Sequence, residues 1–197
     1  MTLFGFLSFS TFLTIICIAV LIWLFTIYTS LIRKKNTVKE AFGSIDVQLK
    51  KRYDLIPNIL TIANKFMEHE RELFTKITEL RAQAMKIPSD VKYAQQKIEL
   101  DKQLSSLIGQ LQVTAENYPQ LKSDQTMVKA MQTFNSTEEY IAAARRYYNA
   151  SVKDLNNSVE IFPSSVIASM LGITKAEFIK AEDFEREPIN GKEYFNK

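Results

Sequence analysis

The feature that most constrains this chain is its first 32 residues, which contain no charged side chain and no histidine. All 25 Lys and Arg residues and all 22 Asp and Glu residues lie from Arg33 onward. Residues 9–32 are apolar except for hydroxyl groups, and roughly 20 helical residues are enough to cross a hydrocarbon core of about 30 Å. The sequence therefore predicts one transmembrane helix over 9–32, after a short N-terminus over 1–8 outside the membrane.

Basic residues directly after this segment predict how it is oriented. Lys and Arg are enriched on the cytoplasmic side of membrane helices. We therefore expect the N-terminus outside and the rest of the chain in the cytoplasm. Near a membrane, such residues attract anionic lipids by about 1 kcal/mol per charge. The basic cluster consists of Arg33, Lys34, Lys35 and Lys39.

Three other interpretations of the apolar segment fit the residues less well. A cleaved signal peptide carries its positive charges before the apolar run, whereas here they follow it. A lipoprotein anchor at Cys17 requires a small residue before the cysteine, and Ile16 stands there. The core helix of a soluble protein would be shorter and followed by a less polar remainder, so the membrane helix is the favoured interpretation.

The polar remainder predicts helices separated by prolines. Apolar residues recur at steps of three and four, as on the buried side of an amphipathic helix. Short connections force neighbouring helices to run in opposite directions. We therefore expect an all-α fold, in which an antiparallel bundle of about four long helices with coiled-coil-like packing occupies residues 36–163. The predicted helices cover residues 37–53, 54–87, 91–118 and 124–162.

Individual residues predict where these helices begin. Asp54 is suited to cap the second helix, with Pro57 in its first turn, where the missing N–H is tolerated. The third and fourth helices have equivalent capping residues, namely Ser89 or Asp90 and Ser123 or Asp124.

Residues 164–197 have a different composition. Apolar residues over 166–171 predict one short helix, which Gly172 is suited to end. From Ile173 onward acidic, basic and aromatic residues alternate. We expect this last part to form a loosely ordered tail.

Composition excludes several classes of protein. Cys17 is the single cysteine and His69 the single histidine, so the chain supplies neither an internal disulfide bond nor a Cys/His zinc site. Di-iron bundles need two Glu-x-x-His motifs, and the five scattered glycines form no phosphate-binding loop. We expect no metal, no cofactor and no catalytic residues. A net charge of +3 gives no case for binding nucleic acid.

Four charged residues fall within the apolar stripes of the predicted helices. An unpaired buried charge is costly, so we expect these residues to pair across helices, for instance Glu70 with Arg145. A partly solvated edge of the bundle and a ligand or metal site are the alternatives. This candidate buried polar network consists of Glu70, Asp101, Glu138 and Arg145.

A second group of polar residues is concentrated near the predicted break between the first two helices of the bundle. It is dense in specific charged and amide side chains, which favours an interaction surface. The alternative is the ordinary solvated side of a helix. We call this group the polar strip, and it consists of Asp46, Gln48, Lys50, Lys51, Arg52, Asp54 and Asn58.

Several blocks of residues match a known family. The longest lies within Ala41–Glu72 and includes Ile45-Asp46-Val47-Gln48-Leu49-Lys50, Asp54-Leu55-Ile56-Pro57-Asn58 and His69-Glu70. Shorter blocks are Asn117–Lys122, Ala144–Asn149 and Phe162-Pro163. In these blocks the chain resembles the LemA family of bacterial membrane proteins. It departs from the family pattern at Phe42, where a tryptophan is common, and in part over 134–140.

The resemblance implies a single N-terminal membrane helix in the bacterial inner membrane and an all-helical cytoplasmic domain, but no particular reaction. We therefore expect a membrane-anchored interaction or scaffold protein. Its expected partner is a further copy of itself, in a homo-oligomer, or another membrane or cytoplasmic protein. An adaptor is favoured over a sensor because almost no chain lies outside the membrane. An enzyme or metal-dependent activity within the bundle is the alternative.

Overall fold

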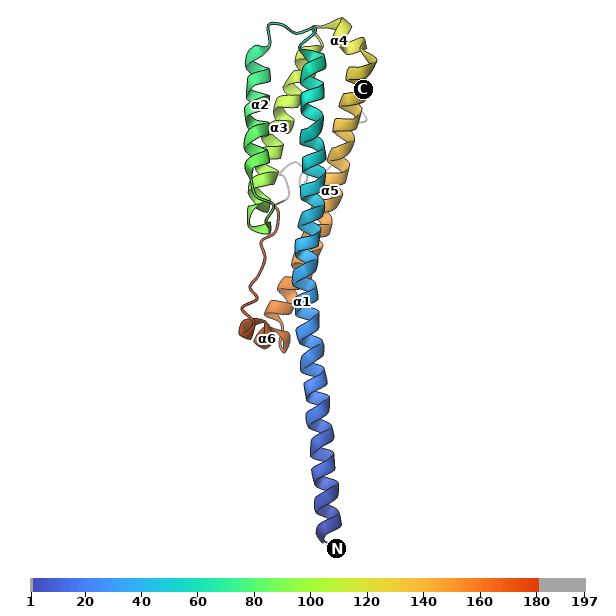
Figure 1. Ribbon diagram of the computed structural model, residues 1–197, viewed down its shortest axis with the longest axis vertical. Helices are drawn as coiled ribbons and strands as arrows, with labels where there is room; N and C mark the ends of the chain where they lie inside the picture. The colour runs from blue at the N-terminus through green and yellow to red at the C-terminus, as the bar shows by residue number, and fades with distance from the viewer. Residues whose placement is uncertain (1, 181–197) are drawn as a thin grey trace, which may run out of the picture.

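The computed structural model describes the backbone of residues 2–180 and the side chains of residues 10–180. Within that range the regular elements are all helices, which confirms the predicted all-α class. Figure 1 shows one very long helix, α1, with the other helices packed along its C-terminal half. The elements are α1 (Thr2–Ala63), α2 (Arg71–Lys86), a 3-10 helix (Val91–Tyr93), α3 (Ala94–Ala115), α4 (Pro119–Ser123), α5 (Gln125–Glu160) and α6 (Ser164–Met170).

The N-terminal part of α1 projects away from the bundle (Figure 1). Every side chain over 10–26 is exposed, and this helix is apolar and long enough to cross a membrane. Burial begins at Leu31, and from there one side of α1 joins the core. The 62 residues of α1 correspond to about 90 Å at the helical rise per residue. A single unbroken helix therefore links the apolar segment to the bundle.

The bundle consists of two antiparallel helix pairs. α5 runs antiparallel to the C-terminal half of α1, and α2 pairs with α3 on the other side of α1 (Figure 1). Phe42 of α1 and Tyr148 of α5 meet edge to face, with their ring centroids 6.4 Å apart. The largest fully buried side chains are Tyr148, Phe134, Leu31, Ile45, Leu49, Ile56, Ile59, Met67, Ile77, Leu104, Ile108 and Leu111.

Two predicted helix starts are confirmed. The Asp90 carboxylate accepts a hydrogen bond from the Lys92 N–H at 3.0 Å and caps the 3-10 helix before α3. The Asp124 carboxylate accepts from the Met127 N–H at 2.8 Å and caps α5. In both cases a short acidic side chain satisfies an N–H that has no partner within its own helix.

The predicted break at Asp54 is wrong. α1 continues through Pro57 to Ala63, so residues 54–63 belong to α1 and α2 begins only at Arg71. A proline inside a helix has no N–H to donate to the carbonyl four residues earlier, and this usually interrupts or bends the helix.

A side chain from α2 explains why the helix continues. The carbonyl left without a helical partner is that of Tyr53, four residues before Pro57. Arg81 of α2 donates from Nε to this oxygen at 2.7 Å. The guanidinium thus replaces the missing backbone donor. The local sequence predicts that the helix ends near Pro57, but the packing of α2 against α1 allows it to continue.

The chain after α6 also differs from the prediction. Gly172, with φ of 62°, ends α6, and the Ile173 N–H donates to the Ala168 carbonyl at 2.9 Å, which confirms the predicted cap. The sequence predicts a loosely ordered tail from Ile173, whereas the structure packs residues 173–180 against the bundle. We call this segment the strap. The rest of the predicted tail, residues 181–197, lies outside the described residues.

Candidate functional site

The middle of the bundle contains a buried ionic cluster around Arg52 of α1. Its Nη1 donates to Oδ2 of Asp101 in α3 at 2.9 Å and lies 2.5 Å from Oε2 of Glu138 in α5. The guanidinium also lies over the Phe134 ring, 4.4 Å from its centroid. One cation therefore joins three helices that are far apart in the sequence.

The environment of Asp101 disfavours its charge. Burial and, less strongly, the nearby Glu138 carboxylate raise the pKa of Asp101 to about 6, although Arg52 and Arg145 act in the opposite direction. Asp101 Oδ1 and Arg52 Nε have no hydrogen-bond partner among the described residues. Burying these charges therefore costs desolvation free energy, and the attraction between the charges offsets that cost.

A second ion pair lies on the side of this cluster that is nearer the apolar segment. Lys97 of α3 contacts Oδ1 of Asp46 in α1, and the Ser89 hydroxyl donates to Oδ2 of Asp46 at 2.6 Å. Burial alone would raise the pKa of Asp46, but the bonds from Lys97 and Ser89 outweigh it and hold the pKa below its usual value. Asp46 therefore stays ionised and ties α1 to the start of α3.

The structure brings together most, but not all, of the predicted buried polar network. Asp101 and Glu138 share Arg52, although Glu138 is exposed and not buried as predicted. Arg145 is buried close enough to act on the Asp101 charge. The expected pair of Glu70 with Arg145 does not form. Glu70 precedes α2 at the far end of the bundle, whereas Arg145 lies in the half of α5 near the strap and donates to the Lys180 carbonyl at 3.2 Å.

The polar strip is not one surface. Arg52 points into the core, and Asp46 faces α3. Lys50 and Asp54 form an exposed pair at 3.0 Å, with Arg81 Nη2 3.9 Å from Asp54. The rest face solvent to differing degrees, with Gln48 half-buried and Lys51 and Asn58 exposed. Because successive residues of a helix point in different directions, the strip divides between packing and solvent.

Two asparagines of α5 hold the strap by its backbone. The Asn149 amide donates to the Ile179 carbonyl at 2.9 Å and accepts from the Ile179 N–H at 3.0 Å. The Asn156 amide makes the same two bonds with Ala176, at 3.0 and 2.9 Å. Each amide thus pairs with the strap much as a neighbouring β-strand would. We call these two residues the amide clamp.

Further polar contacts fix the end of the strap. The Tyr148 hydroxyl donates to the Glu177 carbonyl at 3.0 Å, and the Gln95 side chain of α3 accepts from the Lys180 N–H at 3.3 Å. Burial, with a smaller contribution from the Glu177 charge, raises the pKa of Tyr148, so this hydroxyl stays a donor. The strap is therefore fastened to both α5 and α3.

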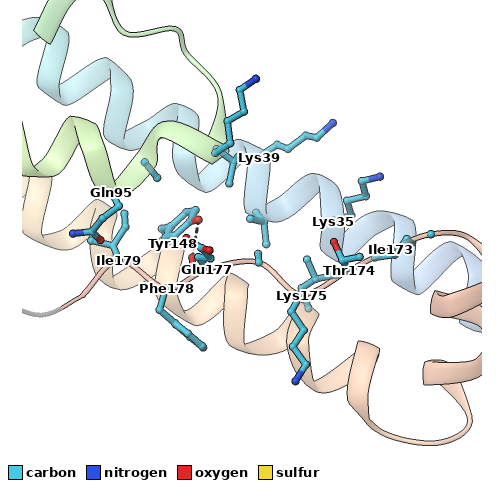
Figure 2. A pocket seen from close by; sticks show the side chains of 17 residues that line it. Lys35, Lys39, Gln95, Tyr148, Ile173, Thr174, Lys175, Glu177, Phe178 and Ile179 are labelled. Carbon is cyan, nitrogen blue, oxygen red and sulfur yellow. Dashed lines mark hydrogen bonds between the residues drawn. The ribbon is translucent and has the colours of Figure 1, made fainter. Parts of the chain in front are cut away.

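A cavity of about 390 Å³ lies beside the strap, where α1, α3 and α5 approach it (Figure 2). Figure 2 shows Lys35 and Lys39, both from the predicted basic cluster, projecting from α1 away from the strap, while Tyr148 points at Glu177. Of the other cluster residues, Arg33 is exposed, and Lys34 donates to the Ser158 hydroxyl at 2.5 Å.

The rim and the walls of this cavity differ in polarity. Its rim carries four exposed lysines and one exposed carboxylate, whereas several of its walls are aliphatic. This combination accommodates an anionic group beside an apolar one. Over residues 10–180 no group of three metal-ligating side chains is present. The charged rim residues are Lys35, Lys39, Lys92, Lys175 and Glu177.

Sequence reasoning missed Arg81, Lys97, Asn149 and Asn156. Three of these had a signal in the sequence. Lys97 stands four residues before Asp101 and so shares its side of α3, and Asn149 and Asn156 are seven residues apart and so share one side of α5. Arg81 had none, because its acceptor, the Tyr53 carbonyl, is left without a partner only if α1 continues past Pro57.

Comparison with known proteins finds one matching family and several relatives. The sequence model of the LemA family matches residues 41–191. Protein LemA of Metamycoplasma hominis is 25% identical over 166 residues, covering 84% of this chain and 74% of that protein. Two magnetosome proteins of Paramagnetospirillum magneticum, MamQ 1 and MamQ 2, are each 18% identical over 184 residues, covering 82% of this chain and 68% of their own.

Proposed function

The chain belongs to the LemA family, and on that premise we propose that it is a membrane-anchored helical scaffold that acts through binding rather than catalysis. The observation that carries this proposal is the continuity of α1 from the exposed apolar segment into the core of the bundle. A helix without a hinge fixes the bundle to whatever holds its N-terminal part. Such a device suits a protein that positions partners at a membrane.

The proposal includes an orientation. The basic cluster stands directly after the apolar segment, which favours the bundle on the cytoplasmic side of the bacterial inner membrane. Protease added to intact spheroplasts should leave the bundle uncut, and lysis should expose it. Digestion of the bundle before lysis would contradict the orientation. Neutralising Arg33, Lys34, Lys35 and Lys39 together should weaken the topological preference, and an unchanged orientation would remove the reason given for it.

Self-assembly through the apolar segment is the finer part of the proposal. Over residues 10–26 every side chain is exposed with respect to the described residues, so helix–helix contacts with further copies are sterically open. The test is the mass of the full-length protein in mild detergent by light scattering, with a chain of residues 36–197 as reference after circular dichroism has shown that it keeps its helices. A discrete assembly that is lost on truncation supports self-assembly. A monomer in both forms contradicts it and leaves an adaptor for another protein.

The side chains of the cavity beside the strap support a function in binding. The one aromatic hydroxyl in it, that of Tyr148, is already donating to a backbone carbonyl, and Glu177 and the lysines are exposed at its rim. The competing possibility is a metal-dependent activity in the bundle. Elemental analysis of the purified full-length protein distinguishes the two, because a stoichiometric metal would contradict a pure scaffold.

A further inference from the structure

A second uncharged stretch follows α5. Residues 161–174 contain no Asp, Glu, Lys, Arg or His, and they include the whole of α6. Several of their apolar side chains are unusually exposed, and they belong to α6 and the turns on either side of it. The exposed fractions are 60% for Ile161, 77% for Phe162, 52% for Val166, 82% for Met170 and 40% for Leu171.

The register of α1 and α5 places this stretch beside the end of the apolar segment. Arg52 faces Glu138, Phe42 faces Tyr148, and Lys34 faces Ser158. α1 and α5 have the same rise per residue and run in opposite directions. Ile161, three residues after Ser158, is therefore level with about residue 30 of α1. In Figure 1, α6 accordingly lies beside α1 where that helix leaves the bundle.

The buried side of α6 already belongs to the core. Ala168 is fully buried in the same apolar cluster as Leu31, with Ile27 and Ile167 packed against that cluster. Because this side of α6 packs against the core, its opposite side faces the surroundings of the protein. The exposed apolar residues are therefore fixed in place by the fold.

We propose that α6 and the turn before it form a second membrane contact, in which Phe162, Val166 and Met170 enter the interfacial layer of the bilayer that α1 crosses. The inference rests on the proposed membrane anchoring of α1. Amphipathic helices bind in this way when an apolar face lies at the level of the headgroups and positive charge is nearby.

The charges around the stretch specify the lipid. On α1 at this level, Arg33 and Lys35 are exposed and Lys34 is half-buried. The nearest carboxylate along the chain, that of Glu160, is neutralised by its ion pair with Lys175. The surface is therefore apolar and positive, which matches an anionic bilayer.

The consequence of a second contact is orientational. A single spanning helix leaves the bundle free to rotate about the helix axis, whereas a second contact beside it fixes which side of the bundle faces the membrane. The strap begins directly after α6, at Ile173, so the same contact also places the lysine-rimmed cavity at a fixed height above the lipid.

The test measures depth in the membrane on the full-length chain. A fluorophore is attached at Met170→Cys in a Cys17→Ser background, and the protein is reconstituted in vesicles of anionic and zwitterionic phospholipid. Lipids carrying a nitroxide near the headgroup or in the middle of the acyl chain then act as shallow and deep quenchers. The matched control is Val113→Cys, which replaces an apolar residue of similar exposure, 73%, at the opposite end of the bundle.

We expect the label at 170 to emit at shorter wavelength than the label at 113 and to be quenched by the shallow lipid more than by the deep one. The label at 113 should be quenched by neither. A label on native Cys17 reports the anchoring of α1 and should be quenched more by the deep lipid. If the label on Cys17 is quenched and the label at 170 behaves like that at 113, the inference is overturned while the anchoring stands. If the label on Cys17 escapes quenching, both fail.

A second pair of variants separates lipid from protein contact. Phe162→Glu alters an exposed side chain, so it should leave the circular dichroism spectrum unchanged and reduce the quenching at 170, whereas Val113→Glu should not. If a second copy of the chain covers this patch instead, the label at 170 will shift its emission without lipid quenching. That shift will also fade as the protein is diluted in lipid, and this outcome would overturn the proposed lipid contact.

Discussion

The middle of the bundle and the end that carries the strap are held together by different chemistry. In the middle, the buried charges of Arg52 and Asp101, together with the exposed carboxylate of Glu138, join three helices. At the end that carries the strap, Asn149 and Asn156 hold an extended segment through hydrogen bonds from neutral amide side chains to its backbone. Arg145 connects the two regions, because it acts on the Asp101 charge and donates to the last residue of the strap.

The difference predicts how each region fails. A buried charge that loses its partner remains uncompensated in the core, so the free energy of unfolding of the whole bundle falls. If the strap loses a hydrogen bond to one of the asparagines, it can move into water, where its backbone groups form hydrogen bonds with water molecules. We therefore expect global destabilisation from changes in the middle and local opening from changes at the strap.

The largest effect is expected for Arg52→Ala. It leaves the buried Asp101 without its closest cation, and breaking such a pair costs about 3–5 kcal/mol. Urea unfolding of the full-length protein in detergent, followed by circular dichroism, measures this loss. The control is Lys51→Ala, an exposed neighbour on the same helix, with an expected change within about 0.5 kcal/mol. Equal effects of the two variants would show that the charged cluster does not hold the bundle.

The next effect is a dependence on pH. The pKa of Asp101 in the fold is about 6, above its ordinary value of 3.8. Between these values the folded state binds more protons than the unfolded state, so this group makes stability fall as pH rises from about 4 to 6. Unfolding free energies at several pH values should show this fall in the wild type relative to Asp101→Asn. Parallel pH profiles of the two proteins would refute the raised pKa.

A smaller effect tests why α1 continues through Pro57. Arg81→Met removes the donor to the Tyr53 carbonyl, and an unsatisfied buried acceptor costs about 1–3 kcal/mol. In a Pro57→Ala background a backbone N–H is available again, so the same change should cost less. A double-mutant cycle on unfolding free energy measures this coupling, with Lys76→Met as an exposed control on α2. Additive losses would contradict the explanation.

The smallest global effect is expected at the strap. Asn156→Ala removes both bonds to Ala176, so hydrogen exchange at Ala176 should quicken by roughly fivefold for about 1 kcal/mol of lost local stability. Global unfolding should change little. The control is Asn157→Ala, an exposed asparagine one position further. A loss of global stability as large as that of Arg52→Ala would erase the distinction between the two regions.

The sequence predicted the elements whose cause is local. The absence of charge before Arg33 predicts the long apolar helix, and the apolar steps of three and four predict the bundle. Of the two capping residues expected at each helix start, Asp90 and Asp124 are the ones that cap. Each of these features depends on a few neighbouring residues. They stay the same whichever way the helices pack.

The site was predicted only in part, because pairing depends on which helix faces which. The sequence identifies Asp101 and Glu138 as charges within apolar stripes, but it predicts that their partner Arg52 belongs to the polar strip. The sequence also predicts a pair of Glu70 with Arg145, whereas the two residues lie far apart along the bundle. The stripe pattern is right for Asp101 and Arg145, which are buried, but not for Glu138, which is exposed. It also carries no information on which residue stands opposite.

The sequence by itself determined that this protein has an uncharged helix at its N-terminus followed by an all-helical domain, because hydrophobic periodicity and charge act within single helices. Only the tertiary structure decided that α1 passes through Pro57 and that residues 173–180 are held in place. In both cases the deciding bond comes from another helix, Arg81 of α2 or the amide clamp of α5. A backbone group without a local partner takes its partner from whatever the packing brings beside it.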